Sequence, residues 1–303
     1  MDTTWFRRFG EQVPSVPRLI CLPHAGGSAS VYAPLARKLS GEGVLDVLAV
    51  QYPGRQDRRA EPAEDSVLGL ATRTADRLAA VADDRPYALL GHSMGALVAY
   101  ETARILHSRS APSPTRLFVS GRSAPGTAPG RHDQLKGDAE ILAAVRSLGG
   151  TDSAVLDDQE MLDMVMPALR ADYGALASYR WQEGPVLNIP LTVLVGDADP
   201  VAPVASTAGW AQQTDQDNEV LVFSGGHFFL SERLYEVSEV VLSRLTAVTG
   251  GSSGIPGSGT VGGIAGGPSA GPGGPQATGR ARPAASSREP GGGDQRTAGR
   301  ALA

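Results

Sequence analysis

The chain has 303 residues, enough for one large domain or two small ones, and a formal net charge of −5. This acidic net charge argues against nucleic-acid binding, which needs a basic surface. The single cysteine, Cys21, excludes an internal disulfide framework and a cysteine-cluster metal site. Cys21 lies in an apolar run, so we expect a buried, inert thiol.

The two ends of the chain contain no long apolar segment. The first eight residues, MDTTWFRR, lack an apolar targeting core, and no run approaches eighteen apolar residues, so we expect a soluble, cytoplasmic protein without a membrane segment. Residues 251–303 are rich in Gly, Pro, Ser and Ala, lack aromatic residues and carry a net charge of +3. Because such a segment buries little apolar surface, we predict a disordered tail after a globular domain at residues 1–250.

Short apolar runs alternate with amphipathic runs along the body of the chain. This alternation is typical of βαβ units and predicts an α/β fold with a mostly parallel central sheet and helices on both faces. The expected strands cover residues 18–23, 46–52, 87–90, 115–120, 190–195 and 219–223. The expected helices cover residues 31–39, 66–82, the stretch from 94 to about 107, and 231–248.

One interval, between residues 123 and 188, breaks the alternation. It contains no convincing strand, and amphipathic runs at 138–148 and 157–179 predict two helices. An insertion after a strand lies over the crevice where open α/β sheets bind ligands. We interpret residues 124–188 as a mobile helical lid, with an ordinary packing subdomain as the alternative. Six apolar residues suggest an adaptable pocket wall or a helix face packed on the core: Met161, Leu162, Met164, Val165, Met166 and Leu169.

The most informative stretch runs from Tyr87 to Tyr100, where an apolar run ends at Gly-His-Ser-Met-Gly and a helix-like run follows. A G-x-S-x-G pattern between a strand and a helix predicts a nucleophile elbow centred on Ser93. The turn is so sharp that the positions two residues away, Gly91 and Gly95, have no room for a side chain. The elbow places the hydroxyl at a helix N-terminus, where N–H groups favour a developing oxyanion. A plain turn that starts a helix is the alternative.

A serine nucleophile needs a base to remove its proton, and the base needs an acid to orient it. Downstream of Ser93 the candidates are His107, His132 and His227. His107 ends the helix that follows Ser93 and lies too far away, and His132 lies in a Pro/Gly-rich loop at the start of the insertion. His227 follows two glycines between the last strand and the last helix. We predict His227 as the base.

The acid is expected in the loop after the preceding strand, in Gly-Asp-Ala-Asp-Pro. Asp199 is preferred, because Asp197 is nearer the strand and better placed to stabilise the turn, although spacing leaves both open. The oxyanion donors are expected to be the backbone N–H of Met94, directly after the nucleophile, and that of Ala25 in a Gly-rich loop, with Gly26 as the alternative. His24 precedes the serine in sequence, which favours a structural or pocket-lining role.

Five motifs follow one another in a fixed order: LPHAGGSA at 22–29, QYPGR at 51–55, GHSMGA at 91–96, GDADP at 196–200 and GGHFF at 225–229. Together they resemble the type II thioesterases of polyketide and nonribosomal peptide pathways, over about residues 18–248. The tail has no counterpart in this resemblance.

The resemblance implies an α/β-hydrolase fold with a helical lid, hydrolysing acyl thioesters on the phosphopantetheine arm of acyl or peptidyl carrier proteins. The usual family role is removal of aberrant or stalled acyl groups from a synthase. The resemblance matches Ser93, Asp199 and His227 to the nucleophile, acid and base, and supports Ala25 and Met94 as oxyanion donors. No cofactor or metal is implied, because the pantetheine belongs to the substrate, and we expect a monomer.

Three other functions stay open at this point. A dedicated chain-releasing thioesterase or cyclase would use the same triad, and a general esterase would act on small oxygen esters. A carrier-protein docking module without catalysis is the third. The charged loop with Arg55, Arg58 and Arg59 is interpreted either as a contact for an acidic carrier protein or as a solvated loop.

Overall fold

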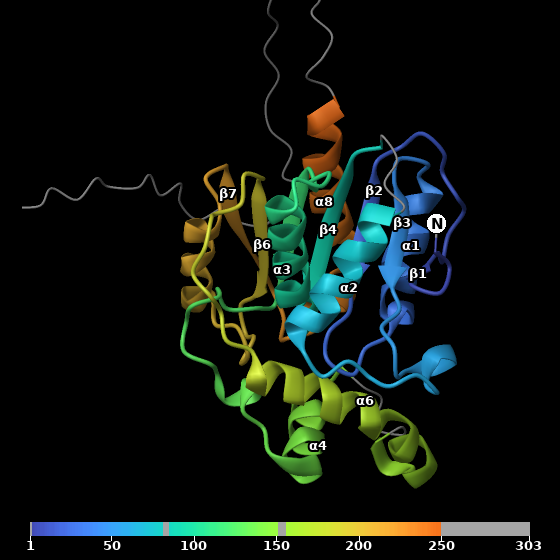
Figure 1. Ribbon diagram of the computed structural model, residues 1–303, viewed down its shortest axis with the longest axis vertical. Helices are drawn as coiled ribbons and strands as arrows, with labels where there is room; N and C mark the ends of the chain where they lie inside the picture. The colour runs from blue at the N-terminus through green and yellow to red at the C-terminus, as the bar shows by residue number, and fades with distance from the viewer. Residues whose placement is uncertain (1, 81–84, 151–155, 250–303) are drawn as a thin grey trace, which may run out of the picture.

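The computed structural model describes residues 2–80, 85–150 and 156–249 (Figure 1). The tail predicted at residues 251–303 and the end of the helix predicted at 66–82 lie outside the described residues. None of the described helices is both long and apolar enough to cross a membrane.

The described strands form one sheet in the order β1-β3-β2-β4-β5-β6-β7. Every neighbouring pair is parallel except β1 with β3, which is antiparallel. The mostly parallel sheet predicted from the alternating pattern is therefore confirmed. The strands are β1 (Phe6–Arg7), β2 (Arg18–Leu22), β3 (Asp46–Val50), β4 (Tyr87–His92), β5 (Arg116–Ser120), β6 (Leu191–Gly196) and β7 (Asn218–Phe223).

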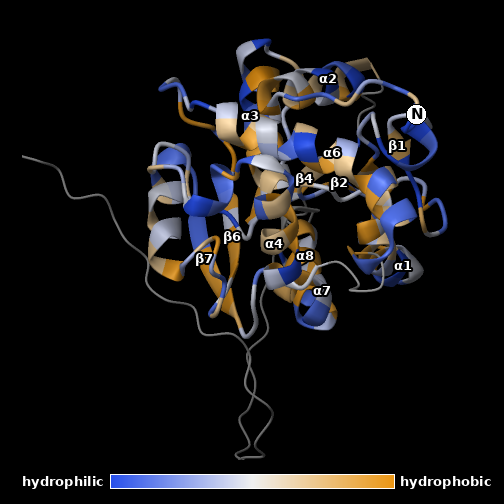
Figure 2. Cartoon of the chain, turned by 90° about the horizontal axis from the view of Figure 1, so that it is seen from below, coloured by the Kyte–Doolittle hydropathy of each residue, from blue (hydrophilic) through white to orange (hydrophobic). Residues whose placement is uncertain are grey.

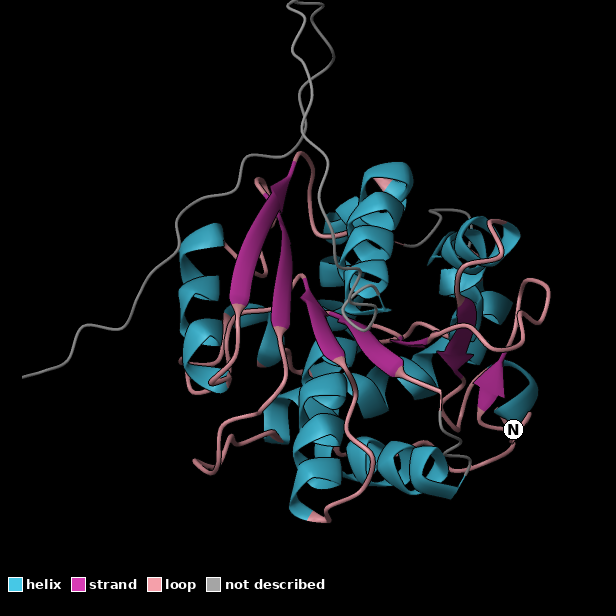
Figure 3. Ribbon diagram, turned by 90° about the horizontal axis from the view of Figure 1, so that it is seen from above, coloured by secondary structure: helices cyan, strands magenta, loops and turns pink. Residues whose placement is uncertain are grey.

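Helices cover both faces of this sheet, so the central strands are continuous apolar runs rather than alternating ones. Figure 2 shows α2 and α3 on one side of the sheet and α7 and α8 on the other, and Figure 3 shows the twist of the strands between them. Two buried apolar clusters match these two faces. Cys21 lies in one of them and has no exposed surface, as predicted, and burial raises the pKa of its thiol.

The described helices outside the insertion are η1 (Ala29–Tyr32), α1 (Ala33–Gly41), η2 (Gln56–Arg58), α2 (Val67–Ala80), α3 (Met94–Ser108), η4 (Val204–Gln213), α7 (Phe229–Glu232) and α8 (Leu234–Thr249). Of these, α1, α2, α3 and α8 correspond to predicted helices, whereas the 3₁₀ helices η1, η2 and η4 were not predicted.

Two helix predictions are corrected by the structure. The α-helix expected from residue 31 begins at Ala33, because Pro34 suits a first helical turn and the preceding residues form a 3₁₀ turn. The single helix expected at 231–248 is broken at Arg233, whose backbone leaves the helical region and whose Nε donates to the Ser224 carbonyl. Periodicity misses this break because the buried residues keep helical spacing on both sides of it.

The insertion between β5 and β6 contains η3 (Arg131–Asp133), α4 (Gly137–Leu148) and α6 (Gln159–Ser178). Figure 1 shows α4 and α6 together across one end of the sheet. α6 begins where the Asp158 carboxylate accepts hydrogen bonds from the Glu160 and Met161 N–H groups. Its apolar face divides: Met166 and Leu169 are buried in the core, Leu162 and Val165 are partly buried against it, and Met161 and Met164 are exposed.

Candidate active site

The elbow predicted around Ser93 is present between β4 and α3. Ser93 has a φ of 55° and a ψ of −117°, a strained conformation for a residue other than glycine. Its N–H donates to the Ser120 carbonyl at the end of β5, over 2.8 Å, which ties the turn to the sheet edge. The hydrogen bond to β5 therefore helps to stabilise the strained backbone conformation of Ser93.

The two glycines of the elbow are required by close backbone contacts. A Cβ atom on Gly91 would overlap the backbone of Gly95, and one on Gly95 would overlap the carbonyl oxygens of Leu22 and Pro23. The absent side chain of Gly91 leaves room for the first turn of α3, and that of Gly95 lets α3 pass close to the end of β2.

Ser93, His227 and Asp199 lie in one hydrogen-bonded line at the carboxyl edge of the sheet. Ser93 Oγ is 3.0 Å from His227 Nε2. His227 Nδ1 is 3.0 and 2.9 Å from the two Asp199 carboxylate oxygens. All three residues are buried. The loops after β4, β6 and β7 deliver them to one place, because parallel strands end at the same edge.

Asp197 and Asp199 have separate roles in the loop after β6. Asp199 Oδ1 accepts hydrogen bonds from the Val201 and Ala202 N–H groups, which orients its carboxylate toward His227. Asp197 is exposed and accepts a hydrogen bond from the Gly225 N–H, which joins the loops after β6 and β7. The structure thus brings Asp199, and not Asp197, to the histidine.

The other histidines differ in their distance from this line. His24 and His132 line the cavity at Ser93, whereas His107 lies exposed in the last turn of α3. Loss of water contact, followed by the charges of His227 and Arg55, lowers the pKa of His24 to about 3. His24 therefore stays neutral at physiological pH, which fits the pocket-lining role expected for it.

His92, the variable residue of the elbow before Ser93, packs beneath the reacting groups. Its ring centroid is 5.0 Å from that of His227, and its Nδ1 is 3.0 Å from Ser120 Oγ. Burial, and then the neighbouring His227 and His24, hold the pKa of His92 well below 6.5. A neutral ring at this position adds no positive charge beside the imidazole of His227.

One of the two expected oxyanion donors lines the same cavity. Ala25 lies in its wall beside Ser93, and Met94 is the first residue of α3. Within the described residues, neither N–H donates to another protein group, so both are available to an anion. The N–H of Gly26, the alternative donor, is instead committed to Asp172 Oδ2 over 2.7 Å.

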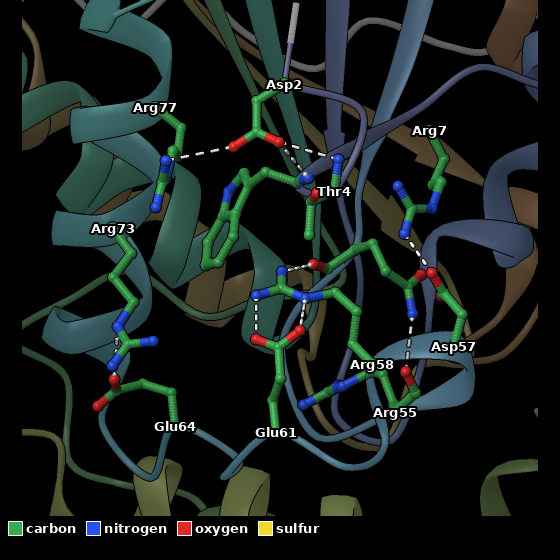
Figure 4. Close-up of polar contacts among 12 residues, drawn as sticks. Asp2, Thr4, Arg7, Arg55, Asp57, Arg58, Glu61, Glu64, Arg73 and Arg77 are labelled. Carbon is green, nitrogen blue, oxygen red and sulfur yellow. Dashed lines mark hydrogen bonds and ion pairs between the residues drawn. The ribbon is translucent and has the colours of Figure 1, made fainter.

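The expectation for the arginine loop is wrong for two of its three residues. Arg55 and Arg58 are only 5% and 7% exposed, whereas Arg59 is exposed. Figure 4 shows the guanidinium of Arg58 forked onto Glu61. Arg55 is forked onto Asp172 of α6. Charge alone suggested an outer surface, but Arg55 pairs with the buried carboxylate of Asp172 on α6, and Arg58 pairs with Glu61 three residues further along the same loop.

Two cavities share part of their walls beneath the insertion. The smaller, about 30 Å³, adjoins Ser93 and His227. The larger, about 550 Å³, is lined by residues 122–130 and by the end of α6. The residues common to both walls are Arg122, Asp133, Leu176 and Val201. The small cavity has room for about two water molecules and the large one for a small-molecule ligand.

Sequence reasoning missed the ion pair at this junction. Arg122 Nη1 is 2.6 Å from Asp133 Oδ1, and both side chains are mostly buried. The only signal was an arginine two residues after β5 and an acidic residue in the following loop, and nothing in their spacing indicated contact. His132, placed in a loop by the sequence, also reaches the cavity wall.

This arrangement is suited to acyl transfer. A neutral imidazole within hydrogen-bond reach of a buried serine can accept its proton, and the carboxylate behind it stabilises the resulting imidazolium. Among the described residues there is no group of three or more His, Cys, Asp or Glu side chains that could hold a metal ion.

Residues 17–246 match the family model described as thioesterase domain. The chain belongs to the thioesterase family. Thioesterase PikA5 of Streptomyces venezuelae is 42% identical over 246 residues, covering 81% of this chain and 87% of that protein. Gramicidin S biosynthesis protein GrsT of Aneurinibacillus migulanus is 34% identical, covering 80% of this chain and 94% of that protein.

The fold of this thioesterase also matches solved structures. The type II thioesterase BorB from the borrelidin biosynthetic cluster is 41% identical, with a TM-score of 0.72 over 80% of this chain and 97% of that one. The α/β-hydrolase fold expected from the motifs is therefore confirmed. The family membership makes the chain a hydrolase that acts on thioesters, as the motifs predicted.

Proposed function

We propose that this thioesterase releases acyl groups from the phosphopantetheine arm of an acyl or peptidyl carrier protein, and that it serves to clear aberrant or stalled groups from a polyketide or nonribosomal peptide synthase. The observation that carries the proposal is the buried line from Ser93 through His227 to Asp199 in a chain of this family. The names of relatives such as the type II thioesterase BorB support the pathway class.

In the first half of the proposed reaction, His227 Nε2 takes the proton of Ser93 Oγ as the oxygen attacks the thioester carbonyl carbon. The carbonyl oxygen becomes an anion, which the N–H groups of Met94 and Ala25 stabilise. The carbon–sulfur bond then breaks, and the pantetheine sulfur takes the proton from His227. The products are a free thiol and an acyl ester on Ser93.

In the second half, water enters the position of the departed thiol. His227 takes a proton from the water as its oxygen attacks the acyl ester, and returns that proton to Ser93 as the ester bond breaks. A free carboxylic acid leaves. Asp199 keeps the proton of the neutral imidazole on Nδ1 in both halves, so that Nε2 is free to act as the base.

The cavities suggest where the acyl group lies. The space at Ser93, about 30 Å³, suits the reacting atoms alone, whereas the adjoining 550 Å³ space suits an acyl chain. We propose that residues 124–188 form a lid over this site and that their movement admits the substrate. All the proposed reacting groups come from one chain, which accords with a monomer.

The experiment is hydrolysis of a panel of acyl groups, each presented on a carrier protein and on a short pantetheine mimic. Editing predicts carrier-dependent release of free acid across many chain lengths, and its loss in Ser93→Ala. A sharp preference for one long acyl group would replace editing by dedicated chain release, and a macrocyclic product would indicate a cyclase. Cleavage of oxygen esters without cleavage of matched thioesters would contradict the assignment.

A further inference from the structure

A buried ion pair joins three segments that are far apart in the sequence. Arg55 Nη1 and Nη2 lie 2.8 Å from the two carboxylate oxygens of Asp172, which belongs to α6. Asp172 Oδ2 also accepts the hydrogen bond of the Gly26 N–H, and Arg55 Nη1 donates to the Gly27 carbonyl over 2.9 Å. The pair therefore holds the loop at residues 24–27 from both a donor and an acceptor.

The pair is sealed from solvent, which fixes its geometry. The side chain of Asp172 has no exposed surface, and that of Arg55 is 4% exposed. The guanidinium carbon of Arg55 lies 5.2 Å from the centre of the Tyr52 ring. A charge this deeply buried is stable only while its partner stays in place, so neither side chain is free to swing away.

The loop held by this pair carries the proposed oxyanion donor. Ala25 is directly followed by Gly26, whose φ of +76° is a conformation that side chains rarely adopt. A Cβ atom on Gly26 would overlap the side chain of Leu169, one turn before Asp172 on α6. The backbone directly after Ala25 is thus held by contacts with α6.

We propose that Asp172, oriented by Arg55, is a positioning residue for thioester hydrolysis: it fixes the loop whose Ala25 N–H meets the oxyanion. The inference rests on the proposed function, in particular on Ala25 as a donor. It makes α6, a helix of the insertion, part of the apparatus that stabilises charge in the transition state. The insertion then has a catalytic contribution in addition to covering the site.

The test uses two single variants and a small substrate, the butanoyl thioester of N-acetylcysteamine, which needs no carrier contact. Asp172→Asn keeps the shape but removes the charge that Arg55 requires. Arg55→Lys keeps a charge but cannot bridge both carboxylate oxygens and the Gly27 carbonyl. We expect kcat to fall on the order of 10- to 100-fold in Asp172→Asn and less in Arg55→Lys, with KM changed by about threefold or less.

A second readout reports on the oxyanion site itself. In the adduct with butylboronic acid, Ser93 Oγ adds to the trigonal boron and its proton passes to His227, leaving an anionic tetrahedral boronate. The affinity of this adduct should fall in parallel with kcat. The affinity of the unreactive thioether analogue of the substrate should change by less than about threefold.

Two controls separate positioning from loss of stability. Asp46 is a matched residue, because it is equally buried and forked by Arg8, but it begins β3 at the opposite edge of the sheet. Asp46→Asn should lower the melting temperature while leaving kcat per folded molecule within about twofold. The double variant Arg55→Met with Asp172→Leu removes both charges and so leaves no unpaired buried charge. Its melting temperature should be higher than that of Asp172→Asn, while its kcat should stay as low as in Asp172→Asn.

The outcomes are distinct. The positioning role would be overturned if the folded double variant kept full kcat. It would also be overturned if Asp172→Asn bound the boronate as tightly as an active wild type does. Either result would leave the proposed function intact. Wild-type protein that does not hydrolyse the thioester would overturn the proposed function, and the inference with it.

Discussion

Two aspartates, Asp197 and Asp199, are separated by one residue, yet they face different partners. The loop turns between them, so that Asp197 accepts the Gly225 N–H at the surface while Asp199 meets His227 in the interior. Local spacing left both open as the acid. The distinction depends on the loop after β7, which reaches this position only in the folded chain.

Replacing each aspartate by asparagine tests this distinction with a matched pair. Asp199→Asn should reduce kcat on the order of 10³- to 10⁴-fold, because the amide no longer favours the imidazole tautomer that accepts the serine proton. Asp197→Asn should keep kcat within about twofold, since it alters only a surface hydrogen bond. Steady-state hydrolysis of a small thioester measures both, and equal losses in the two variants would refute the assignment.

The limits of the sequence are clearest at Arg55 and Asp172. The motif QYPGR marked Arg55 as notable, but its partner lies 117 positions away on a helix whose apolar periodicity was its only visible feature. A buried pair of this kind depends on the packing of α6 against the loop at 24–27. No local pattern carries that information.

At the scale of elements, the strand positions could be predicted from the sequence because buried parallel strands are uninterrupted apolar runs between turn residues. β1 was not predicted, because two residues make no pattern and the strand joins the sheet through its pairing with β3. The elbow could be predicted for a different reason, since its strand, its G-x-S-x-G turn and its helix follow one another directly in the sequence.

The steric account of the elbow predicts opposite effects for two glycine-to-alanine changes. Gly95→Ala should destabilise the protein by about 2–3 kcal/mol or more, because its Cβ would overlap the Leu22 and Pro23 carbonyls. Gly174→Ala, on the exposed side of α6 with open space at its Cβ, should stabilise by roughly 0.5–1 kcal/mol. Urea unfolding measures both. A tolerated Gly95→Ala would contradict the close approach inferred for α3.

At the scale of the whole molecule, the buried histidines link folding to pH. The folded protein holds the pKa of His92 well below 6.5, whereas the unfolded chain protonates this ring near pH 6.5. The unfolded state therefore binds more protons below about pH 6.5, so the free energy of unfolding falls as pH falls. The stability that the neutral His92 ring contributes is fully present above about pH 6.5.

Urea unfolding at pH 7, 6 and 5 should therefore show a loss of stability, with His92 contributing roughly 1 kcal/mol per pH unit below its unfolded pKa. In His92→Asn the slope should be shallower by about that amount. His107→Asn, at the exposed end of α3, is the matched control and should keep the wild-type slope. A slope in His92→Asn as steep as in the wild type would contradict the assignment of a neutral, buried ring.

The measurement that tests the central claim most directly is intact-protein mass spectrometry within milliseconds of mixing with an acyl pantetheine thioester. The proposed reaction predicts an adduct equal to the acyl group less one hydrogen, located on Ser93 and decaying to free acid. This adduct should be absent in Ser93→Ala. Rapid thioester cleavage by Ser93→Ala at the wild-type rate would contradict the account.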